Sequence, residues 1–444
     1  MRQKSVKAAH ETQHVEACPE CGADIPIYPR YSPWCEQCNW NLQPMKARRP
    51  RTPWGRFQAR LGKHSDEHLF KTVNPNSLVP PRITITRAVS LLLATLIHAI
   101  TIVIFYYGIN AIIYNGLEGF QLARVVLLTF IAGWAGYPRF DSVPPNMVLT
   151  ESADFPAVNE LVERVATALN VPKPLIMMTE QFTATFGRVG HRRQPVLCLG
   201  HPFLSILDKK ELVSLVAHEL SHSRDGALTR STYVRVALTT LDRWTMLFST
   251  KRFTRIENDM VRWALFPITL VLYIISAPIL SLTFLLEVCC YRDSQLAEYI
   301  ADAQSLPVGG TQHAVSLLKK SYYRHLEALR IAYDSAPTVY KYSNLKGQLD
   351  AIPERELERV WRIAQRQQIT LRSTHPSLGH RVAFLQSSEA HLAKVTVDDM
   401  LFAELHRELE AWPQVIKDRE KALHMSLADS NYEAAQDALF VAAD

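Results

Sequence analysis

The chain has 444 residues, of which 48% are hydrophobic and 21% are charged, and this length is enough for two to four domains. Its formal net charge is +6, but much of the positive charge lies in the first 90 residues and is therefore weak evidence for a nucleic-acid partner. Four of the seven cysteines form two C-x-x-C pairs, a spacing that favours a reducing compartment and metal binding over disulfide bonds. The polar N-terminus has no apolar core, so no cleaved signal peptide is expected.

The N-terminal region is predicted to be a disordered tail, residues 1–16, followed by a zinc ribbon, residues 17–45. Thirteen residues separate the two knuckles of the ribbon, and its predicted zinc ligands are Cys18, Cys21, Cys35 and Cys38. A ribbon of this size has almost no core, so the metal would supply most of its folding free energy. Ribbons bind nucleic acid, bind protein or only stabilise a domain, and the sequence leaves this open. Trp34 and Trp40 flank the second knuckle and fit contact residues or, as we favour, the small core of the ribbon.

A basic, proline-interrupted linker is predicted over residues 46–87. A nucleic-acid-binding arm fits its charge, but membrane anchoring explains the charge more simply because an apolar run follows. Residues 88–114 contain no Asp, Glu, Lys or Arg and exceed the ~20 residues that cross a bilayer. A weaker apolar stretch at 121–137 completes a transmembrane hairpin over residues 88–138. Since the basic residues precede the hairpin, the positive-inside rule predicts that the ribbon and the segment after residue 138 lie in the cytoplasm.

From Pro138 onward the sequence predicts a soluble domain. Helical periodicity extends over Ala157–Leu169. Three short strands are predicted, at Leu175–Met178, Ala184–Val189 and Pro195–Leu199, and Gly190–Gln194 is predicted to be the turn of a hairpin between the last two. A helix that begins near Lys210 follows, and it is expected to continue to about Phe248.

This helix contains an H-E-x-x-H motif made by His218, Glu219 and His222. On a helix the two histidines lie one turn apart on the same face and can hold a zinc ion. Glu219 lies beside them, where it can take a proton from a zinc-activated water. The alternative is a buried helix that carries two histidines by chance.

A catalytic zinc site needs a third protein ligand, and the candidate is Glu298. Asp302 follows four residues later on the same helix face, where it could accept a hydrogen bond from the remaining ring nitrogen of a ligand histidine. A solvated acidic helix face is the alternative interpretation of both carboxylates.

H-E-x-x-H, followed roughly 75 residues later by E-x-x-A-D, resembles the integral-membrane zinc metallopeptidases that include the CAAX prenyl protease and HtpX-type heat-shock proteases. Thr374–Arg381 resembles the His-Pro segment of that family. The resemblance implies that His375 and Arg381 contact the substrate backbone and stabilise the oxyanion, whereas the residues alone fit the start of a helix.

Two departures from that family pattern are visible. Ser221 stands where a small residue commonly precedes the second histidine, which is a mild change. The family often has Asn-Ala before its substrate-side edge strand, and the matching residues here are Thr183, Ala184, Thr185 and Phe186. The backbone of this strand can still pair with an extended peptide, so the change concerns substrate preference more than catalysis.

The resemblance implies a mostly helical fold with a small β-sheet, in which transmembrane helices join a gluzincin metallopeptidase domain over residues 139–390. It implies one catalytic Zn²⁺ ion, and the two C-x-x-C pairs, which lie outside the resemblance, predict a second, structural Zn²⁺ ion. The implied function is a membrane-bound metalloendopeptidase that cleaves membrane-associated or misfolded proteins at the cytoplasmic face of the cell membrane, with the lipid bilayer and a polypeptide substrate as partners. A catalytically silent membrane scaffold and a ribbon-based binding protein are the alternatives, and a nucleic-acid partner is not expected.

The membrane topology poses a conflict. Residues 264–288 are apolar and long enough for one crossing, yet the three zinc ligands must lie on one side of the membrane, which requires an even number of crossings between them. Either residues 231–249 form another crossing, or 264–288 turns back near Pro278. Charged residues such as Arg243 weigh against a lipid-facing crossing at 231–249. The sequence leaves both possibilities open.

The C-terminal region, residues 391–444, is predicted to form two or three short helices. Leu401, Leu405 and Leu409 form one apolar stripe, and a further helix begins near Tyr432. Packing as a helical hairpin and binding to a protein partner are both open for this region, as protein binding is for the ribbon.

Overall fold

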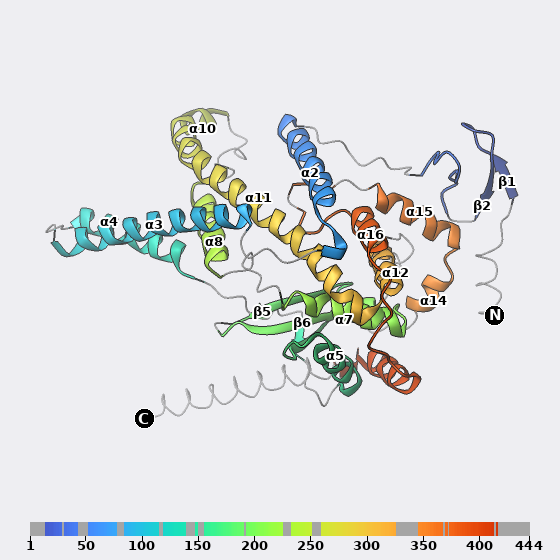
Figure 1. Ribbon diagram of the computed structural model, residues 1–444. Coiled ribbons are helices and arrows are strands. Elements are labelled where there is room, and N and C mark those ends of the chain that lie inside the picture. Colours follow the sequence, from blue (N-terminus) through green and yellow to red (C-terminus); the bar gives the residue numbers. More distant parts are fainter. Residues whose placement is uncertain are drawn as a thin grey trace, which may run out of the picture.

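The computed structural model of the chain describes residues 14–28, 31–42, 52–77, 84–114, 119–138, 147–149, 155–190, 192–224, 232–250, 259–325, 345–366, 369–371, 373–412 and 414–415. Most of these residues are helical, and two small β-sheets accompany the helices (Figure 1). The predicted fold class is therefore confirmed.

The ribbon is built on strands β1 (His14–Ala17) and β2 (Asp24–Ile27), which pair antiparallel. The predicted tail is too long by these first strand residues, and residues 1–13 lie outside the described part of the chain. The small ribbon core contains Ile25, two of the cysteines and, at its edge, Trp40.

Trp34 packs against the peptidase domain, so the preference for a place in the ribbon core was wrong for this residue. Two guanidinium groups of helix α15 (Glu354–Gln365) pack on its buried ring, those of Arg355 at 4.7 Å and Arg362 at 5.1 Å from the ring centroid. Arg359 Nη1 donates to the carbonyl oxygen of Leu42 at 3.0 Å. Arginine–aromatic stacking and these hydrogen bonds hold the ribbon on α15.

The segment predicted as a linker contains helix α2 (Pro53–Thr72). Thr52 Oγ1 accepts a hydrogen bond from Gly55 N at 3.0 Å and Pro53 occupies the first turn, two features that favour a helix start. Leu69 is buried in a cluster with Tyr299 and Phe384 of the peptidase domain. The helix is thus part of the folded body, and the description of residues 46–87 as a linker was wrong for α2.

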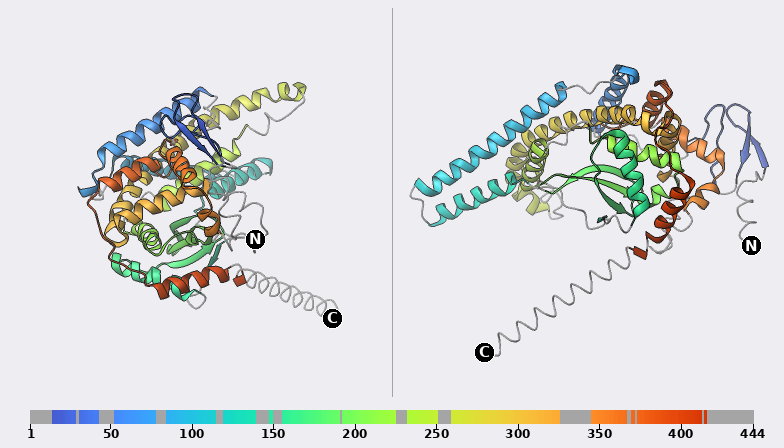
Figure 2. Two further views of the ribbon diagram at one scale, coloured as in Figure 1. Left: turned by 90° about the vertical axis from the view of Figure 1, so that its right-hand side faces the viewer. Right: turned by 60° about the horizontal axis from the view of Figure 1, so that its bottom comes forward.

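Three described helices are long and apolar enough to cross a membrane: α3 (Ile85–Tyr114), α4 (Gly119–Gly136) and α11 (Phe266–Gly309). Helices α3 and α4 form the predicted hairpin and project as a pair from the rest of the molecule (Figures 1 and 2). Most of their apolar side chains are exposed. Long helices whose apolar side chains are exposed are typical of membrane-associated proteins.

Helix α11 resolves part of the topological conflict because it continues through Pro278 without turning back. The region 231–249 forms helix α8 (Thr232–Leu247), which packs on α3, α4 and α11 but is not among the three described helices that are long and apolar enough to cross a membrane, so a crossing at 231–249 stays a prediction. Arg243 Nη1 donates to the carbonyl oxygens of Trp134 and Tyr137 at the end of α4, at 2.6 and 2.9 Å, so its charge is accommodated at a helix C-terminus.

The H-E-x-x-H helix is shorter than expected. Helix α7 (Lys209–Ser221) ends before α8 begins, so the expected continuation to Phe248 was wrong. The short helix α10 (Asp259–Ala264) then leads into α11. Residues 225–231 and 251–258 lie outside the described part of the chain.

The larger sheet has the strand order β3-β4-β6-β5, with β4 parallel to β6 and the other pairs antiparallel. Its strands are β3 (Met147–Leu149), β4 (Leu175–Thr179), β5 (Ala184–Val189) and β6 (Gln194–Gly200). The three predicted strands and the hairpin are confirmed. Gly190 has a φ of 70°, which a tight β5–β6 turn favours.

The main core lies between the larger sheet, α5 (Pro156–Leu169), α7 and the C-terminal segment. Residues 399–412 are helical, and their predicted stripe of leucines is buried in this core. Trp412 packs on Phe155 with ring centroids 5.3 Å apart, and the Glu408 carboxylate accepts from Ala157 N and Val158 N at the start of α5. Residues 391–412 therefore complete the peptidase domain, and the helix predicted near Tyr432 lies outside the described residues.

The remaining helices are α6 (His201–Leu204), α12 (Thr311–Ser321), η3 (Tyr322–His325), α14 (Leu345–Asp350) and α16 (Leu378–Ser387), with η1 (Pro75–Ser77) following α2. Of these, α12, α16 and η1 pack against α11.

Candidate metal centre and peptide-binding cleft

The start of α7 is fixed by a capping box. The Asp208 carboxylate accepts from Lys210 N and Glu211 N, and Glu211 Oε2 accepts from Asp208 N. Glu211 is buried and also pairs with Lys320 Nζ of α12 at 2.6 Å. These contacts set where α7 begins, and they therefore set which face of the helix carries the two histidines.

Helices α7 and α11 approach closely at one point. Ser214 Oγ donates to the carbonyl oxygen of Gly309 at 2.9 Å, and a Cβ added at Gly309 would lie 2.6 Å from Ser214 Oγ. Ser221 is fully buried, and its hydroxyl donates to the Ala217 carbonyl within α7. The small residues Ser214 and Gly309 let the histidine face of α7 approach the acidic face of α11.

The structure brings the three predicted zinc ligands together. His218 Nε2 lies 3.4 Å from Glu298 Oε2, and His222 Nε2 lies 3.5 Å from Glu298 Oε1. One ligand atom from each residue lies within 4.8 Å of the others, and all three side chains are buried. The other ring nitrogen of His218, Nδ1, lies 3.0 Å from Asp302 Oδ1, as predicted for a carboxylate that orients a ligand histidine.

The donor set fits zinc. Two imidazole nitrogens and one carboxylate oxygen are the ligands of open zinc sites, in which a fourth position remains free. Glu298 Oε2 is buried and accepts no hydrogen bond in the described part of the chain, and the groups that face it are His218 Nε2 at 3.4 Å and Arg381 Nη1 at 3.1 Å. Burial by itself would lower the pKa of His218, but hydrogen bonds with Asp302 and Glu298 raise this pKa to about 10. A proton therefore competes with the metal for the ring.

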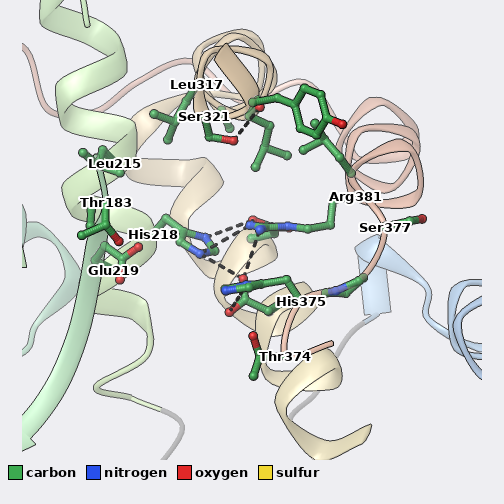
Figure 3. A pocket seen from close by; sticks show the side chains of 18 of the residues that line it. Thr183, Leu215, His218, Glu219, Leu317, Ser321, Thr374, His375, Ser377 and Arg381 are labelled. Carbon is green, nitrogen blue, oxygen red and sulfur yellow. Dashed lines mark hydrogen bonds and ion pairs between the residues drawn. The ribbon is translucent and has the colours of Figure 1, made fainter. Parts of the chain in front are cut away.

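A cavity of about 560 Å³ opens beside these ligands. Glu219 lines it together with His218, and the apolar part of its wall comes from α7 and α12, including Leu215 and Leu317 (Figure 3). The predicted general base Glu219 and two of the predicted metal ligands, His218 and Glu298, thus face one open cleft large enough for several peptide side chains.

Arg381 and His375 point toward His218 across this cavity (Figure 3). Arg381 is buried and forms a bidentate pair with Asp302, at 2.8 Å from Nε and 2.6 Å from Nη2, while its Nη1 lies 3.1 Å from Glu298 Oε2. His375 is 63% exposed in its side chain, and its Nδ1 lies 3.0 Å from Glu298 Oε1. Because the Arg381 guanidinium already pairs with Asp302 and Glu298, the geometry favours a role for Arg381 in orienting the metal ligands. The exposed His375 is better placed to contact substrate.

The predicted substrate strand borders the same cavity. β5 is an edge strand of the described sheet, and Thr183 and Ala184 line the cavity. Phe186 is buried in the main core and Thr185 is exposed away from the lining. The N-terminal end of β5, where a substrate peptide is proposed to pair, is therefore the part of the strand that borders the cavity.

The four ribbon cysteines also form a metal-binding cluster. Their sulfur atoms lie within 4.8 Å of one another, with Cys18 Sγ 3.6 Å from Cys38 Sγ and Cys21 Sγ 3.5 Å from Cys35 Sγ. The backbone N–H of Cys38 lowers the pKa of the Cys35 thiol to about 6, whereas burial raises the pKa of the Cys38 thiol, as expected when neighbouring thiols cannot all ionise without a cation. Four thiolates in this arrangement suit a tetrahedral structural zinc.

Sequence reasoning missed the residues that hold the His375 segment from outside. Gln295 of α11 donates from Nε2 to the Ser373 carbonyl at 2.9 Å, and Asp66 of α2 binds Ser377 and His380. A signal existed for Asp66, because Gly62, Asp66 and Leu69 recur at helical spacing and all three are buried.

Comparisons with known proteins agree with this site. The model of peptidase family M48 matches residues 152–389. The chain is 27% identical to a "Protease HtpX homolog" of Caldanaerobacter subterraneus over 45% of this chain and 65% of that protein, and 25% identical to one of Pyrococcus furiosus over 38% and 57%. A third, from Methanothermobacter thermautotrophicus, is 25% identical over 51% of this chain and 80% of that protein.

These matches cover only part of this chain and part of each relative. The chain covers less than two thirds of the length of the first two relatives, and no solved structure matches significantly. The family match nevertheless covers more than half of the chain and includes the H-E-x-x-H helix, Glu298 and the His375–Arg381 segment. The chain belongs to peptidase family M48.

Proposed function

We propose that this protein is a membrane-bound zinc metalloendopeptidase. One observation carries the proposal: His218, His222 and Glu298 converge from α7, its C-cap and α11, and His218 and Glu298 line, together with Glu219, a cavity bordered by an edge strand. The names of the similar proteins, each called a protease, support the same activity. The ribbon cysteines would hold a second, structural zinc.

Each residue has a distinct chemical task in the proposed hydrolysis. A zinc ion held by the three ligands would supply Lewis-acid chemistry at the scissile carbonyl. Glu219 acts as the general base, taking a proton from the attacking water and passing it to the leaving amine. His375 donates a hydrogen bond toward the negative charge that develops on the carbonyl oxygen, while Arg381 and Asp302 keep His218 and Glu298 oriented.

The proposed substrate is an extended segment of a membrane-associated or misfolded polypeptide. Such a segment can add to the free edge of β5 near Thr183 and Ala184, with one side chain in the apolar part of the cavity. We place the site and the ribbon at the cytoplasmic face of the cell membrane, because the basic residues precede α3 and two crossings, α3 and α4, separate the ribbon from the domain. Protein quality control is the corresponding cellular role.

The test is the substitution Glu219→Gln, which keeps the shape of the side chain and removes the base. Turnover of an unfolded protein substrate should fall about 100- to 10,000-fold, while zinc content stays at the wild-type value. Glu163→Gln, on an exposed part of α5, is the matched control and should leave turnover unchanged. Equal proteolysis by wild type and Glu219→Gln would instead favour the silent scaffold or the ribbon-based binding protein.

A further inference from the structure

Helix α2 lies against the segment that carries His375 and Arg381. A Cβ added at Gly62 would lie 2.6 Å from Leu371 N and 2.8 Å from the carbonyl carbon of Thr370, so the two backbones are in direct contact. Arg292 Nη1 of α11 donates to the Ser65 carbonyl at 2.5 Å and fixes α2 from the other side. The helix that precedes the membrane hairpin is therefore wedged between α11 and one wall of the cleft.

Asp66 makes the most specific of these contacts. It is only 4% exposed, and its two oxygens face two donors of the same segment. Oδ1 accepts from Ser377 N at 3.3 Å and Oδ2 lies 2.8 Å from His380 Nδ1. Phe70, one turn further along α2, stacks on the His380 ring with centroids 4.5 Å apart and planes 5° apart. The carboxylate also lies at the N-terminus of α16, where a negative charge is favourable.

These contacts bracket the residues that face the cavity. His375 lies two residues before Ser377, and Arg381 directly follows His380. On the other side of the segment, Gln295 holds the Ser373 carbonyl. A short stretch held at both ends by buried polar side chains has few alternative conformations, so the direction in which His375 points depends on Asp66 and Gln295.

We propose that Asp66 is a positioning residue of the peptidase site, acting through Ser377 and His380 to hold the His375–Arg381 segment in the orientation that meets the substrate. The inference rests on the proposed function and adds a residue from outside the matched family region. It also gives α2 a task beyond linking the ribbon to the membrane hairpin, since it forms the outer support of the cleft.

The experiment compares Asp66→Ala with Glu67→Ala in the full-length, zinc-loaded protein. Glu67 is the adjacent acidic residue; its side chain is 43% exposed and forms an ion pair with Lys63 at 3.7 Å. Three readouts are combined: kcat and KM for an unfolded protein substrate, zinc content, and hydrogen exchange of residues 373–381. His380→Ala, alone and combined with Asp66→Ala, tests whether the two side chains act together.

The expected result for Asp66→Ala is a fall in kcat of about 100-fold, with unchanged zinc content and faster exchange at residues 373–381. Because His375 acts mainly in the transition state, KM should change less than kcat. The double variant should lose little more than Asp66→Ala alone, as expected for residues that act as a unit. Glu67→Ala should match the wild type in all three readouts.

Three results would overturn the inference: unchanged exchange in Asp66→Ala, faster exchange with wild-type kcat, or equal losses in Asp66→Ala and Glu67→Ala. If Asp66→Ala does not fold, His380→Ala carries the same comparison, and wild-type exchange and kcat in that variant would count against the proposal. Failure of the proposed function has a different signature, since wild type and Glu219→Gln would then be equally inactive while the exchange readout still decides whether Asp66 holds the segment.

Discussion

The two metal-binding clusters of this protein are assembled in opposite ways. The four ribbon cysteines come from two turns within one short stretch, residues 18–38, around a core of very few side chains. The ligands of the other centre come from α7 and α11, which are far apart in sequence and are held together by the main core and the Ser214–Gly309 approach. The ribbon site is local, whereas the peptidase site depends on tertiary packing.

Because of this difference, loss of zinc should affect the folding of one site and the chemistry of the other. In a ribbon with so small a core, metal binding and folding are one event, and apparent zinc-binding free energies in such units reach roughly 10–16 kcal/mol. The proposed peptidase ligands belong to a region whose capping, packing and hydrogen bonds are made largely by residues other than the ligands. Loss of zinc should therefore unfold the ribbon but leave the peptidase domain folded and inactive.

The largest expected effect is at the peptidase centre. His222→Ala should lower zinc content from two ions per chain to one and reduce proteolysis by about 1,000-fold or more, because one of three ligands is removed. Helical content measured by circular dichroism should not change, since the core around α7 remains. His64→Ala, on the exposed side of α2, is the control. Retention of two zinc ions by His222→Ala would exclude His222 as a ligand.

An intermediate effect is expected in the ribbon. Cys35→Ser should also remove one zinc ion, but hydrogen exchange should become fast throughout residues 14–42 while proteolysis stays within about twofold of wild type. Exchange mass spectrometry and turnover measure the two responses separately. A tenfold loss of proteolysis would contradict the separation of the two sites and would mean that the ribbon supports the cleft through α15.

The smallest effect concerns the contact between the two regions. Arg362 stacks on Trp34 and its Nη1 donates to the carbonyl oxygen of Glu36 at 2.5 Å. Arg362→Ala should weaken ribbon docking by about 1–2 kcal/mol, seen as faster exchange around Trp34 with normal zinc content. Arg366→Ala, at the exposed end of the same helix, should have no effect. Equal exchange in both variants would show that Arg362 does not hold the ribbon.

What could be predicted from the sequence follows the same division between local and non-local features. The two C-x-x-C pairs, the histidines of α7, the β5–β6 hairpin and the α3–α4 hairpin were predictable because spacing within one element determines their geometry. Glu298 was a weaker candidate, since its partners lie on another helix. It became convincing only when the E-x-x-A-D resemblance was added.

The errors arose where packing between distant segments decided the outcome. Trp34 has the large apolar side chain of a core residue, but two arginines more than 300 residues later in the chain pack on it. Asp66 is one acidic residue in a segment whose basic average suggested a solvated linker. The C-terminal leucine stripe identified a helix but could not identify its partner, which is the peptidase core itself.

Helix α11 determines how far a substrate must reach. It is a continuous helix of 44 residues, or about 66 Å at 1.5 Å per residue, and it contains both the apolar membrane segment and Glu298. Glu298 lies ten residues beyond Val288, the end of that segment, which is about 15 Å further along the helix. An extended chain advances about 3.3 Å per residue, so a membrane-anchored polypeptide needs about five residues outside the bilayer to reach the metal centre. The continuous helix would thus favour cleavage at sites that lie at a fixed distance from the membrane.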